Sequence, residues 1–181
     1  MRDDLIEKTI SSKRIHEGKV LNLRVDEVLL PNDNISIREI VEHNGAVAIV
    51  AITNDNKILL VRQYRKAVEK VLIEIPAGKL EKGESPYDCA QRELIEETGH
   101  RPTQLEEVME IITSPGFCTE KIHLFIARDL VADYLENDED EFIDLIALEL
   151  DEALEKIANG EIVDSKTIIG LFYYKLHLSA S

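Results

Sequence analysis

The sequence predicts an α+β fold in which the first half of the chain is mostly β-structure. Three observations lead to this prediction. Short apolar segments separated by turn residues fill residues 12–75, as is typical of strands. A segment with the residues typical of both helix ends lies at 86–98, and two further helical segments follow residue 150. The 181 residues are enough for one sizeable core and too few for two typical domains.

Strands account for the chain before the central helix. Ala46–Ile52 contains no polar residue, so we expect a strand that is buried on both faces. Asn54-Asp55-Asn56 has the composition of a hairpin turn, which predicts an antiparallel meander. Pro76 ends the last of these strands, because proline has no N–H to donate to a sheet. The expected strands cover residues 20–30, 36–43, 46–52, 57–64 and 71–75.

The central helix is predicted over Pro86–Thr98, and both of its ends are marked. Ser85 is a favourable N-cap residue, with proline at the first helical position and Asp88 three residues after the cap. Gly99 provides the C-terminal stop. At about 100° of rotation per residue, one stripe of the helix is expected to face the core, and it consists of Tyr87, Ala90, Leu94 and Thr98.

Three strands and two helices are expected after the central helix. The strands cover residues 105–112, 121–127 and 142–150, and the helices cover 151–158 and 164–177. Asn159-Gly160 separates the two helices, because both residues favour a helix end. The chain shows no internal repeat and no low-complexity linker.

The charge and the cysteine usage exclude several classes of partner and compartment. Lys and Arg number 21 and Asp and Glu 36, so the net charge is −15 and we expect neither nucleic acid nor an anionic membrane as a partner. The two cysteines, Cys89 and Cys118, have no metal-type spacing and suit a reducing cytoplasm. Acids interrupt the first eight residues, unlike a signal peptide, and no apolar run approaches the roughly 20 residues of a membrane span. We therefore expect a cytoplasmic protein.

Three acidic residues gather on one face of the central helix. Glu93 and Glu97 are four residues apart and lie about 40° from each other, away from the core stripe, and Glu96 borders them. Like charges at this spacing cost about 0.2–0.5 kcal/mol a pair, which suggests a divalent cation that offsets the repulsion. Oxygen ligands favour Mg²⁺ or Mn²⁺ over zinc or copper. The alternative is a solvated acidic face in which Arg92 pairs with Glu96.

The residues around this face follow a longer pattern. Five residues separate Gly78 from Glu84, and seven more precede Arg92-Glu93-Leu94, which continues into Ile95-Glu96-Glu97-Thr98-Gly99. This resembles the signature box of the Nudix hydrolases, G-x5-E-x7-R-E-U-x-E-E-x-G-U, where U is a bulky aliphatic residue. Every fixed position matches except the last, where His100 replaces an apolar residue.

The resemblance implies a fold and a domain organisation. The fold is the Nudix α/β/α sandwich with a mixed β-sheet, here with an extra N-terminal β-meander. Residues 1–44 would form the N-terminal strands and residues 45–181 the hydrolase domain. In similar enzymes these strands are exchanged between two subunits, so a homodimer follows by resemblance. The alternative is that the apolar residues 20–23 pack within their own chain.

The resemblance also implies a metal site and catalytic groups. Two to three Mg²⁺ or Mn²⁺ ions would be held by carboxylates and one backbone carbonyl, those of Ala77, Glu84, Glu93, Glu96, Glu97 and Glu141. The catalytic residues would be Glu93, Glu97 and a general base, Glu139. Five of the six residues 136–141 are acidic, and apart from the resemblance this stretch indicates a solvated loop. A shift of one residue in the match would put a neighbouring acid in the place of Glu139 or Glu141.

Further segments resemble the ADP-ribose pyrophosphatase branch of the family. Pro115, within Ser114-Pro115-Gly116-Phe117, lies sixteen residues beyond Gly99, a position that marks this branch. Segments 38–43, 63–65 and 74–78 match as well. The substrate-binding residues that this implies are Arg38, Glu39, Arg65, Gly116 and Glu120.

Each of these segments also has a simpler interpretation. Arg38 and Arg65 are typical strand-surface cations, and Pro115-Gly116 is typical of a turn. Glu39 would face either the adenine or a partner subunit.

The function that the resemblance implies is metal-dependent hydrolysis of ADP-ribose to AMP and ribose 5-phosphate. Hydrolysis of another nucleoside diphosphate sugar, such as a GDP-hexose, is the enzymatic alternative. A catalytically silent ADP-ribose-binding protein is the alternative of a different class, although such a protein would usually show broken box acids, and here they are intact.

Overall fold

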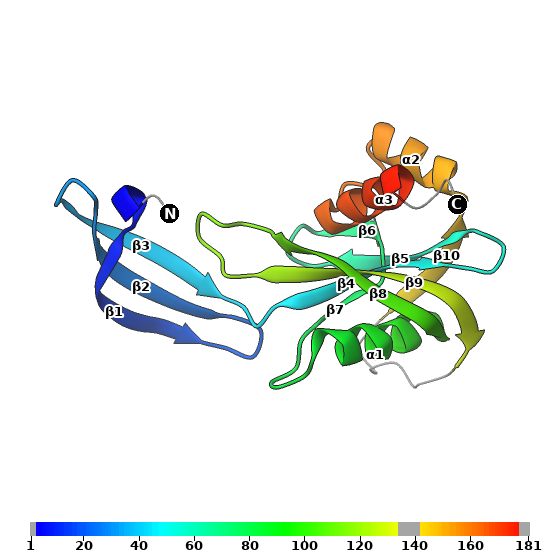
Figure 1. Cartoon of the computed structure of the whole chain (residues 1–181), viewed down its shortest axis with the longest axis horizontal. Coiled ribbons are helices and arrows are strands. Elements are labelled where there is room, and N and C mark those ends of the chain that lie inside the picture. Colours follow the sequence, from blue (N-terminus) through cyan, green and yellow to red (C-terminus); the bar gives the residue numbers. More distant parts are fainter. Residues whose placement is uncertain (1–2, 134–141, 178–181) are drawn as a thin grey trace. The chain divides into compact units, whose positions relative to one another are not determined.

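The computed structural model describes residues 3–133 and 142–177 (Figure 1). The chain forms two compact units. The first unit comprises Met1–Gly45 and Ile112–Lys121, and the second comprises Ala46–Ile111 and Ile122–Ser181. No helix in the described ranges combines the length and the apolar character of a membrane span.

The first unit contains a three-stranded antiparallel sheet. A 3-10 helix, η1 (Asp3–Leu5), precedes the strands β1 (Lys8–Glu17), β2 (Asn22–Leu29) and β3 (Ile35–Glu42), which lie in the order β1-β2-β3. All residues of β1 are exposed, so this strand has no apolar alternation to mark its start at Lys8. The N-terminal strands were expected, but their beginning is defined by pairing with β2.

The second unit is built on a mixed sheet. Its strands are β4 (Ala46–Ile52), β5 (Ile58–Arg65), β6 (Lys70–Glu74), β7 (Ala77–Lys79), β8 (His100–Ile112), β9 (Lys121–Ala132) and β10 (Ile143–Leu148). The order is β10-β5-β4-β9-β8, with β6 beside β5 and β7 beside β4. β4 pairs with β5 and β7 in antiparallel and with β9 in parallel. The antiparallel β4-β5-β6 meander is therefore confirmed, within a sheet that is mixed overall.

Helices cover both faces of this sheet (Figure 1). The helix α1 (Pro86–Thr98) packs on one face through Cys89, Ala90 and Leu94. The helices α2 (Leu150–Ala158) and α3 (Ser165–His177) pack on the other through Ala153, Leu171 and Tyr174. The predicted α/β/α sandwich is thus confirmed.

The strand β4 shows why the apolar run of the sequence has to be central. Val47, Ile49 and Ala51 belong to the core cluster on the α1 side, and alternate residues belong to the cluster on the α2 and α3 side. Side chains alternate between the faces of a strand, so a strand with helices on both sides needs apolar residues throughout.

The ends of α1 lie where the sequence places them. The Ser85 hydroxyl accepts the Asp88 N–H at 3.1 Å, and Gly99 ends the helix with a left-handed φ of 68°. One expectation for the core stripe is wrong, because Tyr87 is 48% exposed. The buried residues of α1 begin at Cys89, so the first turn of the helix is not packed against the sheet. The spacing of apolar residues predicts which face of a helix is buried, but not at which residue the burial begins.

Other element limits differ from the predictions by a few residues. No strand was expected between residue 75 and the central helix, but the short strand β7 lies there. The strand β8 begins at His100, directly after the α1 cap, and β9 continues to Ala132. Both extensions are partly exposed, and the one in β8 is mostly polar, so pairing between strands contributes to these limits beside the apolar pattern.

Candidate functional site

The site begins where β7 approaches α1. A Cβ atom on Gly78 would lie 1.8 Å from the carboxyl carbon of Glu93, far inside any permitted contact. Glycine allows the backbone of β7 to lie directly against the Glu93 carboxylate, whereas a side chain at this position would displace that carboxylate. The contact explains why the box begins with glycine fifteen residues before this glutamate.

Three carboxylates surround the guanidinium group of Arg92. Its Nε and Nη2 donate to the two oxygens of Glu84 at 2.9 and 3.1 Å. Its Nη1 donates to Glu93 Oε1 at 2.8 Å and to Glu96 Oε2 at 2.9 Å. Arg92 therefore pairs with Glu96, as expected of the helix face, and it also draws Glu84 from the preceding loop to the same point.

The pKa shifts of Glu84 and Arg92 favour the charged form of each. The hydrogen bond from Arg92 lowers the pKa of Glu84. The hydrogen bond to Glu84 raises the pKa of Arg92, although burial opposes the shift, and the charge of Glu93 adds to it. Three carboxylates against one guanidinium leave a net charge of −2 on this face. This surplus favours a further cation.

Glu97 occupies a different position on the same helix. Its side chain is only 7% exposed, and its Oε2 accepts the Ala77 N–H at 3.0 Å. Glu97 and Ala77 were both predicted as metal ligands, Glu97 through its carboxylate and Ala77 through its carbonyl oxygen. The structure joins them directly, so the carboxylate of α1 holds the backbone that leads into β7.

The donor set fits a hard divalent cation. The groups are carboxylate oxygens, and such ligands favour Mg²⁺ or Mn²⁺. Glu93 and Glu96 each contact Arg92 through one oxygen. Within residues 3–133 and 142–177, no three His, Cys, Asp or Glu side chains are arranged as a preformed ion cage. Of the acids that would hold an ion, Glu84, Glu93 and Glu96 are bound to Arg92 in this structure.

Arg65 lies in an ion-pair network on the same unit. Its Nε and Nη2 donate to the two oxygens of Glu74 at 2.8 and 2.9 Å, and Lys166 of α3 donates to the same carboxylate. Glu74 is 1% exposed. Burial raises its pKa, but hydrogen bonds from Arg65 and the charge of Lys166 outweigh that effect and lower it. A buried acid thereby fixes the orientation of the predicted phosphate-binding arginine.

Sequence reasoning did not assign a role to Glu74 or Lys166. One indication was available, since Glu74 is an acid at the end of the otherwise apolar strand segment 71–75. An acid in such a place needs a buried cationic partner. The partner itself could not be found, because Lys166 is 92 residues away in the sequence.

The other predicted substrate-binding residues lie in the first unit. Arg38 donates to Glu7 at 2.9 and 2.5 Å, and Glu39, its neighbour in β3, points to the opposite face of the sheet. Gly116 lies in an exposed turn where a Cβ atom would meet nothing within 4 Å. Glu120 accepts the Thr113 hydroxyl at 2.8 Å and lies 3.6 Å from His43 Nδ1.

The remaining predicted site residues are Glu139 and Glu141, and the chain also has two cysteines, Cys89 and Cys118. Glu139 and Glu141 lie outside the described residues. Cys89 is buried on the face of α1 that packs against the sheet, and this burial raises the pKa of its thiol to about 12. Such a thiol stays neutral, which agrees with a packing role. Cys118 is partly exposed and is a free thiol as well.

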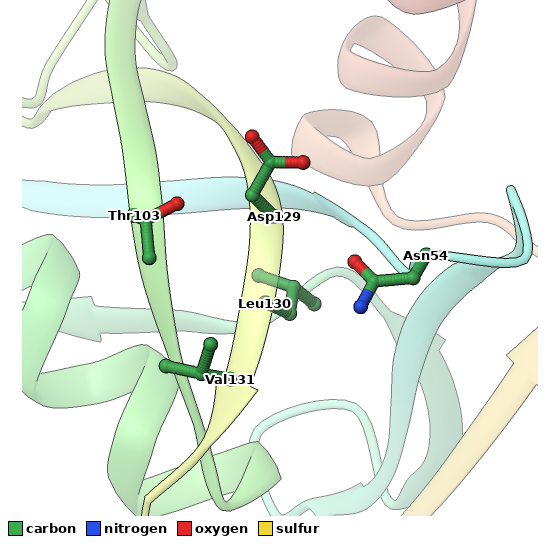
Figure 2. A pocket seen from close by; sticks show the side chains of 5 residues that line it. All are labelled: Asn54, Thr103, Asp129, Leu130 and Val131. Atoms are coloured by element: carbon green, nitrogen blue, oxygen red, sulfur yellow. The ribbon is translucent and has the colours of Figure 1, made fainter.

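An open hollow elsewhere in the second unit does not coincide with this site. It has a volume of about 320 Å³ and lies beside β8, β9 and the turn after β4 (Figure 2). Its lining residues are Asn54, Thr103, Asp129, Leu130 and Val131. None of these lining residues is a predicted site residue.

Comparison with known proteins agrees with the geometry. Residues 42–168 match the NUDIX domain, and residues 7–41 match the nucleoside diphosphate sugar hydrolase N-terminal domain. The chain is 55% identical to the methanol dehydrogenase activator of Bacillus methanolicus, over 94% of this chain and 93% of that protein. It is 46% identical to the ADP-ribose pyrophosphatase of Bacillus subtilis (strain 168), over 95% and 94% of the two chains.

The fold also matches a solved structure. The crystal structure of an ADP compounds hydrolase superposes with a TM-score of 0.86 over 97% of this chain and 96% of that chain, at 22% sequence identity. The NUDIX match covers well over half of the sequence and contains Gly78, Glu84, Arg92 and the acids of α1. The chain therefore belongs to the Nudix hydrolase family.

Proposed function

We propose that this Nudix hydrolase cleaves the pyrophosphate of ADP-ribose. Water adds across the phosphoanhydride bond, and the products are AMP and ribose 5-phosphate. The observation that carries this proposal is the assembly of Glu84, Glu93 and Glu96 at one point beside the Ala77–Glu97 contact. The resemblance of the chain to an ADP-ribose pyrophosphatase supports the choice of substrate.

Nudix hydrolases generally use divalent metal ions, and we propose two to three Mg²⁺ or Mn²⁺ ions here. The residues that would hold them are Ala77, Glu84, Glu93, Glu96, Glu97 and Glu141. A divalent ion supplies Lewis-acid activation of phosphorus and lowers the pKa of a bound water. The surplus negative charge around Arg92 and the hard oxygen donors support this assignment.

The chain's own residues supply the remaining functions. Glu93 and Glu97 are held in place by Arg92 and by the Ala77 N–H, so their carboxylates are oriented before substrate arrives. We assign the general base to Glu139, which would accept a proton from the attacking water. The substrate-binding residues of the proposal are Arg38, Glu39, Arg65, Gly116 and Glu120.

Arg65 is the best supported of the substrate-binding residues. Two of its three guanidinium nitrogens bind Glu74, and within the described part of the chain no hydrogen bond uses the third, Nη1. The side chain is 39% exposed, so this nitrogen can reach a ligand. A guanidinium oriented in this way suits a phosphate oxygen, because its charge and its planar donors are already aligned.

We also propose a homodimer formed through residues 1–44, with residues 45–181 as the hydrolase domain. Ile35 and Ile37 of β3 are 62% and 56% exposed, and every residue of β1 is exposed. Apolar side chains on a single-layer sheet gain stability when a second surface covers them. Sedimentation equilibrium of the purified chain tests this assembly, and a monomer at all concentrations contradicts it.

The cytoplasm is the proposed compartment, and a small-molecule nucleoside diphosphate sugar is the proposed ligand. The free thiols of Cys89 and Cys118 support a reducing compartment. The net charge of −15 disfavours nucleic acid and anionic membranes as partners.

A substrate panel with an acid variant tests the proposed reaction. ADP-ribose and GDP-hexoses are incubated with Mg²⁺ or Mn²⁺, and phosphate is measured after a phosphatase is added. We expect Glu97→Gln to lower the ADP-ribose rate at least about 100-fold. The fold should persist, since glutamine can still accept the Ala77 N–H. The control Glu106→Gln, at an exposed position of β8, should keep the full rate.

Two outcomes contradict the proposal. One is tight binding of ADP-ribose without turnover, which would indicate a silent binding protein. The other is a faster reaction with a GDP-hexose, which would indicate a different nucleoside diphosphate sugar as the substrate.

A second candidate function is activation of an alcohol-oxidising enzyme. The 55% identity to the methanol dehydrogenase activator favours it specifically. Methanol dehydrogenase of Bacillus methanolicus is assayed with the wild-type chain and with Glu97→Gln. If hydrolysis underlies activation, the wild type accelerates methanol oxidation and the variant does not. Equal rates with and without the chain contradict this candidate.

A further inference from the structure

The backbone that leads into β7 is held by three separate elements. The Ile75 N–H donates to Thr167 Oγ1 of α3 at 2.9 Å. The Pro76 carbonyl accepts the Ile49 N–H of β4 at 2.8 Å, and the Ala77 N–H donates to Glu97 of α1 at 3.0 Å. The peptide unit that ends at the Ile75 N–H is therefore tied to α3, and the peptide unit between Pro76 and Ala77 is tied both to the sheet and to the acidic helix.

The Thr167 hydroxyl has a defined direction. It donates to Asp164 Oδ2 at 2.6 Å and accepts the Ile75 N–H. The same Asp164 oxygen accepts the Thr167 N–H at 3.0 Å, which caps the first turn of α3. Thr167 is 0% exposed, so water cannot replace it as the acceptor. The hydroxyl is thus a fixed link between this helix cap and the Ile75 peptide.

Close packing of α3 brings this hydroxyl within reach. A Cβ atom on Gly170 would lie 2.8 Å from Val50 Cγ2 and 3.1 Å from Ile75 Cδ1. Gly170 and Thr167 are three residues apart and lie on the same helix face. The absence of a side chain at 170 therefore lets the helix approach the sheet at the place where Thr167 meets Ile75.

We propose that Thr167 is a positioning residue for the metal site, an inference that rests on the proposed function. Without its hydroxyl, the buried Ile75 N–H has no partner, and the peptide shifts to find one. Ala77 is two residues further along, so such a shift displaces its carbonyl and its contact with Glu97. The first turn of α3 thus sets the geometry of ligands on the opposite side of the sheet.

Replacements of Thr167 that separate shape from hydrogen bonding test this role. Thr167→Val keeps the shape and removes the hydroxyl, and Thr167→Ser keeps the hydroxyl. Mg²⁺ and Mn²⁺ binding to the chelator-treated protein is measured by calorimetry. We expect about 10-fold weaker binding for Thr167→Val, as for other residues that orient metal ligands. Thr167→Ser should bind like the wild type, and the Ile75 amide should exchange faster with deuterium in Thr167→Val only.

Thr53 provides a matched control. Its hydroxyl donates to Asp55 Oδ1 at 2.6 Å and accepts the Lys57 N–H at 2.9 Å, the same pattern as at Thr167. It lies in the β4–β5 turn, outside the proposed metal site. Thr53→Val should leave ion affinity unchanged. The comparison separates loss of a turn hydroxyl in general from loss of this particular link.

Kinetics distinguish positioning from a purely structural role. For Thr167→Val, raising the Mg²⁺ concentration should restore the wild-type kcat, because the ligands are displaced and not removed. If the folded variant binds ions like the wild type, the inference is wrong. If Thr167→Val does not fold, Thr167→Ala is judged by the same criterion. A wild-type chain that binds ions and hydrolyses none of the substrates contradicts the proposed function and leaves the ion-affinity comparison decisive for Thr167.

Discussion

The two units of the chain differ sharply in how much they bury. In the second unit, six of the seven residues of β4 are buried. In the first unit, all ten residues of β1 are exposed, and Val28 is the one buried hydrophobic residue among those that the structure describes. Both units are β-sheets, so secondary structure is not what separates them. The difference is whether helices cover the sheet.

The polar contacts of the two units differ in the same sense. In the first unit, Arg14 and Arg24 both bind the partly exposed Glu42. Arg24 also binds the buried Asp26, which has no lysine partner among the described residues. In the second unit, Arg65 and Lys166 meet at a buried carboxylate, Glu74. Exposed pairs contribute little to stability, whereas a buried pair depends strongly on each partner. We therefore expect mutations of similar chemistry to have very different effects in the two units.

The largest expected effect comes from the core of the second unit. Leu124→Ala removes a fully buried side chain of β9 that packs between the sheet and α3. We expect a loss of about 4 kcal/mol in the free energy of unfolding, from lost burial and the cavity left behind. Urea denaturation measures it. A loss below about 1 kcal/mol would mean that this core is not the source of stability.

The next effect concerns the buried carboxylate. Glu74→Gln leaves Lys166, which is 11% exposed, with less negative charge nearby, and it weakens the fork to Arg65. We expect a loss of about 2 kcal/mol. The measurement is urea denaturation with a chelator present, so that ion binding does not contribute. Glu106→Gln, on the exposed side of β8, is the control and should change stability little.

Lowering the pH should remove the contribution of Glu74 to the free energy of unfolding. The pKa of Glu74 in the folded chain is below the ordinary value of 4.5. Its contribution is present above pH 4.5 and is lost as the pH falls through the lower folded value. Unfolding free energies measured from pH 7 downward should therefore decrease below that point. The decrease should be shallower for Glu74→Gln, and equal slopes for the two proteins would contradict the assignment.

The smallest effect is expected in the first unit. Ile37→Ala truncates an aliphatic side chain that is 56% exposed. In dilute protein, where a dimer dissociates, the change in unfolding free energy should stay below about 0.5 kcal/mol. At higher concentration the same variant should lower the dimer fraction. A loss in dilute protein as large as that of Leu124→Ala would remove the contrast between the units.

Local patterns in the sequence predicted the elements whose limits are chemically marked. The cap residues Ser85 and Gly99 predicted the limits of α1, and the unbroken apolar run predicted the central strand β4. Exposed strands were harder to predict. The start of β1 and the polar beginning of β8 depend on hydrogen bonds to a neighbouring strand, and no local pattern encodes such pairing.

The acidic face was equally accessible from sequence, because it depends on spacing within a single helix and its preceding loop. Glu84, Arg92, Glu93 and Glu96 were grouped in advance, and the structure brings them together. Whether they hold ions stays a prediction, as do the roles of Glu139 and Glu141.

The sequence by itself therefore determined the type and order of most elements, the acidic face of α1 and the family. Only the tertiary structure decided that Tyr87 is exposed, that Glu74 gathers Arg65 and Lys166, and that Thr167 holds the Ile75 peptide. The physical reason is the distance along the sequence over which each interaction acts. Helix spacing and caps act over a few residues, whereas these contacts join residues up to 92 positions apart and form only when the sheet is covered by its helices.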